Sequence, residues 1–270
     1  MSVHVNLVVA LNSEARPLIE YYGMHLEEQH GGLRIYTGEN ASLAIGGIGA
    51  TGSATAVGFL AAHNEHRNRI WVNVGIAGHH QADLGQVYLV DKIVGTDINQ
   101  TQFPSICFPS PIPSSTLTTV IEPQTDYAPD TLYDMEGAAF FDAAARFSSV
   151  ELISLIKVVS DNQSHPITKI SKSIVEGLIS EALPAVTVII ENCRALANEL
   201  DEISNSGAQS WLSGRHASTT ERLKFTRLHH RLACLSKENE IASLLEKTRD
   251  TQEAISVLEK HLSSARLNMP

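Results

Sequence analysis

Cysteine is scarce in this sequence, and the three that occur, Cys107, Cys193 and Cys234, are far apart and form no CxxC pair. This spacing argues against a disulfide framework or a cysteine metal site, so we expect reduced thiols. Long apolar runs are also missing. The run at residues 5–10 ends in polar residues, and no later run approaches the roughly 20 residues of a membrane span. No basic leader precedes it, and we expect a cytoplasmic protein without a membrane segment.

Positive charge is in short supply, because 20 Lys and Arg residues face 30 Asp and Glu residues, for a formal net charge of −10. Most of the negative charge lies in residues 1–200, which hold 21 acidic and 10 basic residues. Residues 201–270 hold 9 acidic and 10 basic residues. Nucleic-acid binding depends on Lys and Arg at the phosphates, so the acidic part argues against it. The apolar content of 43% is that of a soluble globular protein.

Short apolar runs alternate with helical segments along residues 1–200. The runs VNLVVA, RIWVNVGIAG and ELISLIKVVSD read as strands, and a helix is expected from Ser13. This alternation predicts an α/β fold, in which ligands bind beyond the carboxyl ends of the strands. The proline-rich stretch from Thr96 to Asp130 reads as a long loop or as an open, partly extended segment. The helical stretch near residue 190 is expected to be interrupted or kinked at Pro184.

The composition changes near residue 200. A linker-like stretch, NSGAQSWLSGRHAS, precedes a segment with apolar residues at helical spacing. We therefore predict two domains, residues 1–200 and a helical C-terminal extension of residues 201–270 with two or three amphipathic helices. The apolar faces of these helices suit docking on the first domain or on a protein partner.

The stretch LYDMEGAAFF places two carboxylates, Asp134 and Glu136, just before an apolar, alanine-rich run. Charged residues at the edge of a core usually have a partner. They either hold a ligand or favour the positive end of the following helix.

Four pieces in order carry a resemblance to a known family: VVALNSEARPL, GGIGATGSATAV, VNVGIAGHHQADLGQVYLVDKIV, and YDMEGAAF with IKVVSDN. Together they resemble the nucleoside phosphorylase and nucleosidase superfamily over roughly residues 3–195. The resemblance implies a three-layer fold with a mixed central sheet flanked by helices. It also implies a small-molecule nucleoside as ligand, a homo-oligomer, and neither a cofactor nor a metal.

The resemblance assigns roles to the acidic residues. Glu136 would accept hydrogen bonds from ribose hydroxyls, Met135 would pack on the sugar, and Asp134 would support them. Asp161 would protonate the leaving purine, with Ser160 orienting it; the alternative is a helix N-cap or turn aspartate.

Glu14 would position the attacking water, and Ile76 stands where the family has a serine. Gly49 and Gly75 belong to turns that let backbone approach the ligand. The phosphorylases carry an arginine where this chain has Asn73, and Arg16 is the nearby cation on the first loop. Without that arginine, water is favoured over phosphate as nucleophile. His79 and His80 point to opposite sides of an extended chain and do not suggest a metal site.

The match departs from the family between residues 96 and 130, where Phe103, Phe108 or Tyr127 would have to supply the ring that stacks on the base. Adenine, hypoxanthine and modified bases all stay open. The prediction is hydrolysis of the N-glycosidic bond of a purine-type nucleoside. The alternatives are a nucleoside-binding or partner-docking protein without turnover, and a phosphorylase with a rearranged phosphate site.

Overall fold

The computed structural model describes residues 3–63, 70–96, 100–124, 126–166, 168, 170–205, 207–233 and 238–264. The chain divides into two compact units, Met1–Ala197 and Asn198–Pro270. The division falls inside helix α4 (Lys172–Asn205), close to the domain boundary predicted at residue 200.

The first unit is built on one mixed sheet. Its strands are β1 (Val5–Val9), β2 (His25–His30), β3 (Leu33–Thr37), β4 (Ala41–Ile45), β5 (Ile70–His79), β6 (Val87–Gly95), β7 (Gln100–Gln102), β8 (Ser114–Thr119), β9 (Thr131–Asp134) and β10 (Ile153–Asp161). β5, β10, β6, β8 and β9 pair in turn and close on β5, while β1, β4, β3 and β2 extend from β5 as an open arm, and β7 pairs with β6. The sheet is mixed because β1, β5 and β10 run parallel while β6 is antiparallel to β10.

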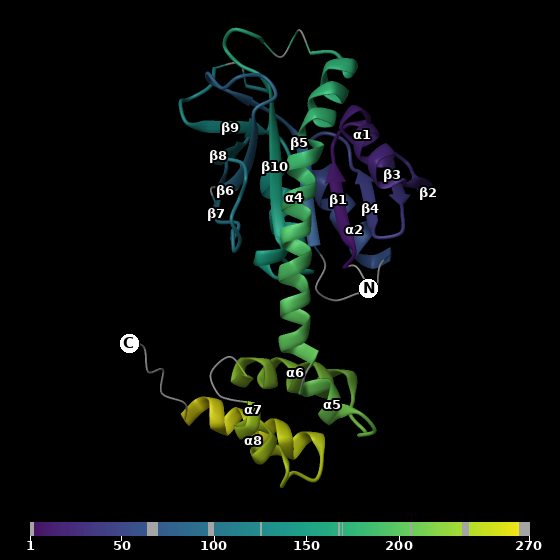
Figure 1. The fold of residues 1–270 in the computed structure, drawn as a ribbon, viewed down its shortest axis with the longest axis vertical. Coiled ribbons are helices and arrows are strands. Elements are labelled where there is room, and N and C mark those ends of the chain that lie inside the picture. The colour runs from purple at the N-terminus through teal and green to yellow at the C-terminus, as the bar shows by residue number, and fades with distance from the viewer. Residues whose placement is uncertain are drawn as a thin grey trace. The chain divides into compact units, whose positions relative to one another are not determined.

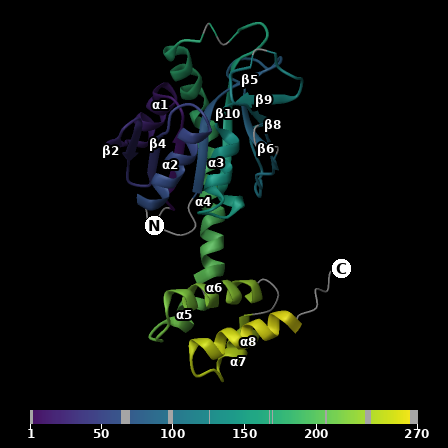
Figure 2. The same cartoon turned by 180° about the vertical axis from the view of Figure 1, so that it is seen from behind.

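Helices cover both faces of this sheet. α1 (Asn12–Tyr22) and α4 lie in front of it in Figure 1, and α2 (Ala50–His63) and α3 (Gly137–Ala144) cover the other face in Figure 2. A short 3-10 turn, Val150–Leu152, precedes β10. The predicted fold class, a three-layer α/β fold with a helical C-terminal extension, is confirmed.

The central strands are apolar because both of their faces are covered. Every residue of β1 and of β10 is buried, and Trp71 of β5 and Phe140 of α3 are among the largest fully buried side chains. Such continuous apolar runs are typical of parallel strands between helical layers. Since β1, β5 and β10 are parallel, their carboxyl ends meet at one edge, where Glu14 and Asp161 follow β1 and end β10.

Three local expectations from the sequence are wrong in part. The Thr96–Asp130 stretch contains the strands β7 and β8, and β8 forms because its Ser and Thr side chains suit a strand paired on both edges, with β6 and β9. α4 is not interrupted at Pro184, because the proline ring lies on the exposed side of the helix, where water can reach the carbonyl freed by the missing N–H. The kink expected there stays a prediction. α1 begins at Asn12 rather than at Ser13.

α4 is also long and apolar enough over Lys172–Leu200 to cross a membrane, by length and composition alone, with a mean hydropathy of 1.7. Its buried residues Val175, Ile179, Val186 and Ile190 recur at helical spacing, as in a core helix of a globular fold. The absence of a membrane segment stays a prediction.

The second unit is helical, as expected. It contains α5 (Ala208–Leu212), α6 (Thr219–Ala233), α7 (Glu238–Leu245) and α8 (Thr251–Ser264). The short α5 lies in the stretch predicted to be a linker, where Trp211 stacks on Phe225. Phe225, Leu232 and Leu258 are fully buried, so this unit has an apolar core of its own.

Candidate active site

A cavity of about 170 Å³ opens at the carboxyl ends of β1, β5 and β10. Residues from distant parts of the chain line it, including seven of the nine predicted site residues: Glu14, Ile76, Asp134, Met135, Glu136, Ser160 and Asp161. The other two lie behind this lining. Gly49 donates its N–H to Glu136 Oε1 at 2.7 Å, and a Cβ on Gly75 would lie 3.1 Å from Glu14 Oε1.

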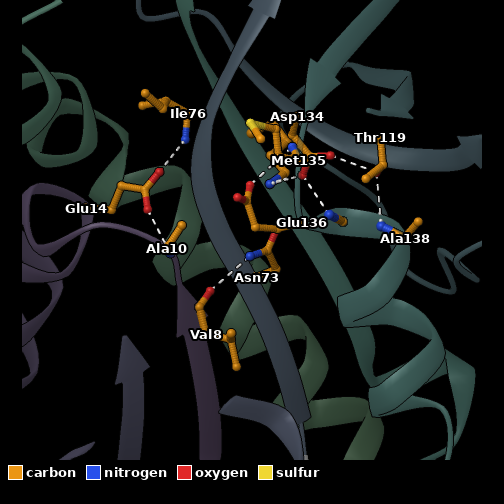
Figure 3. A network of polar contacts seen from close by, with 12 residues as sticks. Val8, Ala10, Glu14, Asn73, Ile76, Thr119, Asp134, Met135, Glu136 and Ala138 are labelled. Atoms are coloured by element: carbon orange, nitrogen blue, oxygen red, sulfur yellow. Dashed lines mark hydrogen bonds and ion pairs between the residues drawn. The ribbon is translucent and has the colours of Figure 1, made fainter. Parts of the chain in front are cut away.

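Glu14 is held in place by backbone donors. Its Oε1 accepts the Ile76 N–H and its Oε2 accepts the Ala10 N–H, each at 3.0 Å (Figure 3). Oε2 also accepts the Leu11 N–H at 2.8 Å. Burial raises the pKa of Glu14, and these hydrogen bonds and the nearby Lys157 ammonium oppose the rise. Glu14 is thus a fixed carboxyl group in the cavity wall, suited to accept a proton from a small molecule.

Asp134 is fully engaged with the protein. Thr119 Oγ1 donates to its Oδ1 at 2.7 Å, and Oδ2 accepts the Gly137 N–H at the start of α3 at 2.8 Å. The same Oδ2 lies 2.7 Å from Lys157 Nζ, and both side chains are buried. Asp134 therefore fits the helix-start interpretation and supports the turn that carries Glu136.

Lys157 is a further residue of the site, and it is absent from the predictions made from the sequence. It interrupts the apolar strand β10, and its side chain is 1% exposed. Burial lowers its pKa, but the charges of Asp134, Glu136 and Glu14 outweigh this and raise the pKa overall. The signal in the sequence was a single lysine in the run ELISLIKVVSD, because such a charge needs a buried partner.

Glu136 lies between β9 and α3, as the N-cap residue of α3, and lines the cavity. Besides the bond from Gly49, its Oε2 accepts the N–H of Met135 at 3.3 Å. Burial, reinforced by the charge of Asp134, raises the pKa of Glu136 to about 7, against the opposing influence of Lys157 and Gly49. Each carboxylate oxygen keeps capacity for a further donor, so Glu136 can accept hydroxyl groups from a ligand.

Asp161 ends β10 and is 2% exposed. Ser160 Oγ donates to its Oδ1 at 2.5 Å. The hydroxyl of Tyr127 donates to Oδ2, and burial followed by this bond raises the pKa of Tyr127. From the sequence, Tyr127 is only one of three candidates for the ring that stacks on the base. Of the other two, Phe103 is 64% exposed, and Phe108 does not line the cavity.

The two residues weighed for a phosphate site lie elsewhere. Arg16 is exposed and pairs with Glu20 and Glu176 at 3.0 and 3.4 Å. Asn73 is buried, and its side-chain N–H donates to the Val8 carbonyl at 3.0 Å, which ties β5 to β1. Among the described residues that line the cavity there is no Lys or Arg.

The adjacent histidines serve the loop after β5. His79 Nδ1 accepts the N–H groups of Gln81 and Ala82, and His80 Nδ1 lies 2.9 Å from the Tyr127 carbonyl oxygen. Within the described part of the chain, no group of three or more His, Cys, Asp or Glu side chains could hold a metal ion.

Structural comparison finds a similar fold in solved nucleosidases. Arabidopsis thaliana 5'-methylthioadenosine nucleosidase matches with a TM-score of 0.58 and 18% identity, over 71% of this chain and 96% of that one. The Colwellia psychrerythraea 5'-methylthioadenosine/S-adenosylhomocysteine nucleosidase, in complex with adenine, matches with a TM-score of 0.56 and 17% identity. The match covers 72% of this chain and 95% of that one. Futalosine hydrolase of Helicobacter pylori matches with a TM-score of 0.54 and 13% identity, over 71% of this chain and 99% of that one.

Sequence comparison gives a different picture, because no protein-family model matches this chain and no curated protein does. The relationship is therefore carried by the arrangement of the strands and helices. The chain shares its fold with these nucleosidases.

Proposed function

We propose that this protein hydrolyses the N-glycosidic bond of a purine-type nucleoside. The observation that carries the proposal is the cavity lining, which brings Glu14, Glu136 and Asp161 together at one edge of the sheet without a lining Lys or Arg among the described residues. Hydrolysis of this bond requires an acceptor for the sugar hydroxyls, an acid for the leaving base and a base for water. These three carboxyl groups match those three tasks.

In the proposed reaction, the bond between ribose C1' and the base nitrogen breaks, and the base takes the electron pair. Asp161, in its protonated form, transfers its proton to the purine so that the base leaves neutral. The ionised Glu136 holds the ribose hydroxyls and favours the positive charge that develops on the sugar. Water then bonds to C1' and gives its proton to Glu14, whose raised pKa suits it to accept one.

Water fits this site better than phosphate does. An inorganic phosphate dianion needs compensating cations or several N–H donors aimed at it. The buried cation nearest the carboxyl groups is Lys157, and it already pairs with Asp134. A neutral nucleophile avoids placing a further negative charge beside Glu14 and Glu136.

The test is base release from a panel of nucleosides. We would incubate the purified protein with 5'-methylthioadenosine, S-adenosylhomocysteine, futalosine, adenosine and inosine in phosphate-free buffer and quantify free base by chromatography. We expect release from at least one of them, lowered by about a hundredfold or more in Asp161→Asn. Asp126→Asn removes an exposed carboxyl group outside the cavity lining and is the matched control. No release from any nucleoside, together with unchanged ligand binding by Glu136→Gln, would refute the proposal.

A second candidate is a nucleoside-binding protein without turnover, and one observation favours it. The acid Asp161 is hydrogen-bonded to Tyr127 rather than open to a ligand. This candidate predicts a rise in Tm on addition of a nucleoside, with no free base in the same sample.

A further inference from the structure

The segment between β8 and β9 places one side chain inside the molecule. Over residues 121–130, every described residue is exposed except Tyr127, which is 5% exposed. An exposed segment with a single buried aromatic residue is anchored by that side chain, because burying its ring accounts for most of the apolar area the segment removes from water.

The ring of Tyr127 enters the site beside β5. A Cβ on Gly78 would lie 2.7 Å from three atoms of the Tyr127 side chain, so the ring fits there only because residue 78 is a glycine. On its other side the ring packs against Tyr133, with centroids 5.3 Å apart. Tyr133 Oη also accepts the Ala128 N–H at 3.1 Å, which fixes the backbone after Tyr127.

The hydroxyl of Tyr127 is hydrogen-bonded to the Asp161 oxygen that a ligand would approach. Oδ1 is already bonded to Ser160, and Tyr127 donates to Oδ2. A base that receives a proton from Asp161 must approach the same carboxyl group within hydrogen-bond distance. Because the Tyr127 side chain also fills the space beside Gly78 and Oδ2 in the cavity, Tyr127 and a base nitrogen compete for the same place at Asp161.

The size of the cavity agrees with this competition. Its volume of about 170 Å³, measured with Tyr127 among the lining residues, is below the roughly 300–1,000 Å³ of typical small-molecule sites. Moving the Tyr127 side chain outward would enlarge the space beside Gly78 and free Asp161 in one step.

We propose that Tyr127 occupies the position of the nucleobase in the ligand-free protein and must leave it before a nucleoside can bind. This inference rests on the proposed function, since it takes Asp161 as the group that meets the base. Tyr127 then sets the affinity for the base, because each ligand must outcompete its hydrogen bond to Asp161 and its packing against Gly78.

A stacking role for Tyr127 makes the opposite prediction. If the ring packed on the face of a bound base, its removal would weaken binding by the value of an aromatic contact. The sign of the change in affinity therefore distinguishes occupation of the base position from stacking on the base.

The experiment measures binding of adenine and hypoxanthine to the full-length protein by calorimetry. Tyr127→Phe removes only the hydroxyl and keeps the ring, and we expect about tenfold tighter binding. Tyr127→Ala should bind at least as tightly as Tyr127→Phe. Tyr21→Phe, at a tyrosine that is 52% exposed and outside the cavity lining, is the matched control and should leave affinity unchanged.

Equal affinities for the wild type and both Tyr127 variants, or weaker binding by Tyr127→Ala, would overturn the inference and leave the proposed function standing. Binding by neither the wild type nor any variant would overturn both. Should Tyr127→Ala fail to fold, Tyr127→Phe still decides the question. A crystal structure with bound base gives the geometric readout, and a Tyr127 hydroxyl still on Asp161 would overturn the inference.

Discussion

Replacing Glu136 by glutamine should make this protein more stable, and the gain should grow with pH. Glu136 is the carboxyl group whose pKa rises from an ordinary 4.5 to about 7, chiefly because it is buried. A carboxyl group whose folded-state pKa lies above its unfolded-state value opposes folding once it ionises. The wild type therefore loses stability as the pH rises from about 4.5 to about 7, and the loss then stays constant.

The magnitude follows from the separation of the two pKa values. At about 1.4 kcal/mol per pH unit, a pKa of about 7 instead of 4.5 corresponds to roughly 3 kcal/mol of lost stability at about pH 8. At about pH 5 the same group costs less than about 1 kcal/mol. Glutamine carries no charge and still offers an oxygen to the Gly49 N–H, so Glu136→Gln removes this cost and keeps that hydrogen bond while losing the longer one from the Met135 N–H.

The assay is urea denaturation of wild type and variant at several pH values between about 5 and 8. The difference in unfolding free energy should grow by about 2–3 kcal/mol across this range. Glu39→Gln, at an exposed glutamate in the turn between β3 and β4, is the matched control and should show no such growth. A difference between Glu136→Gln and wild type that does not change with pH would refute the reasoning about the buried carboxyl group.

Other predictions concern ligand binding, the ion pair and the nucleophile. Nucleoside affinity should rise with pH through about 7 as Glu136 ionises and accepts ribose hydroxyls. Affinity for free adenine, measured alongside by calorimetry, should depend less on pH. The same pH dependence of affinity for the nucleoside and for adenine would contradict the ribose role. Lys157→Met should destabilise the protein by about 3–5 kcal/mol in chemical denaturation because it leaves Asp134 buried and unpaired, while Lys224→Met, which breaks an exposed pair, should cost no more than about 1 kcal/mol. Glu14→Gln should slow base release by about a hundredfold with little change in nucleoside affinity, since it removes the acceptor for the water proton; an equal loss of affinity would point to a binding role instead.

The sequence predicts those site residues whose positions follow from the local residue pattern and from the direction of the strands. Glu14 lies a few residues after one apolar run and Asp161 ends another, and parallel strands bring such residues to one edge of a sheet. Glu136 and Met135 were singled out by the motif before an alanine-rich helix. All four line the same cavity.

Contacts between distant segments could not be predicted in the same way. The partner of Lys157 is Asp134, on another strand, and nothing in the local sequence names it. Strand β8 was missed because its Ser and Thr residues follow several prolines, and its pairing with β6 and β9 decides its conformation. The Tyr127 bond to Asp161 likewise depends on how the segment after β8 folds back over β5.

Turnover of a nucleoside in water labelled with the heavy oxygen isotope, with inorganic phosphate present, tests the central claim most directly. Mass spectrometry of the sugar product identifies the nucleophile. We predict free base and a sugar that carries the heavy oxygen at C1', at a rate that does not respond to added phosphate. A sugar 1-phosphate, or no base release from any nucleoside of the panel, would contradict the account.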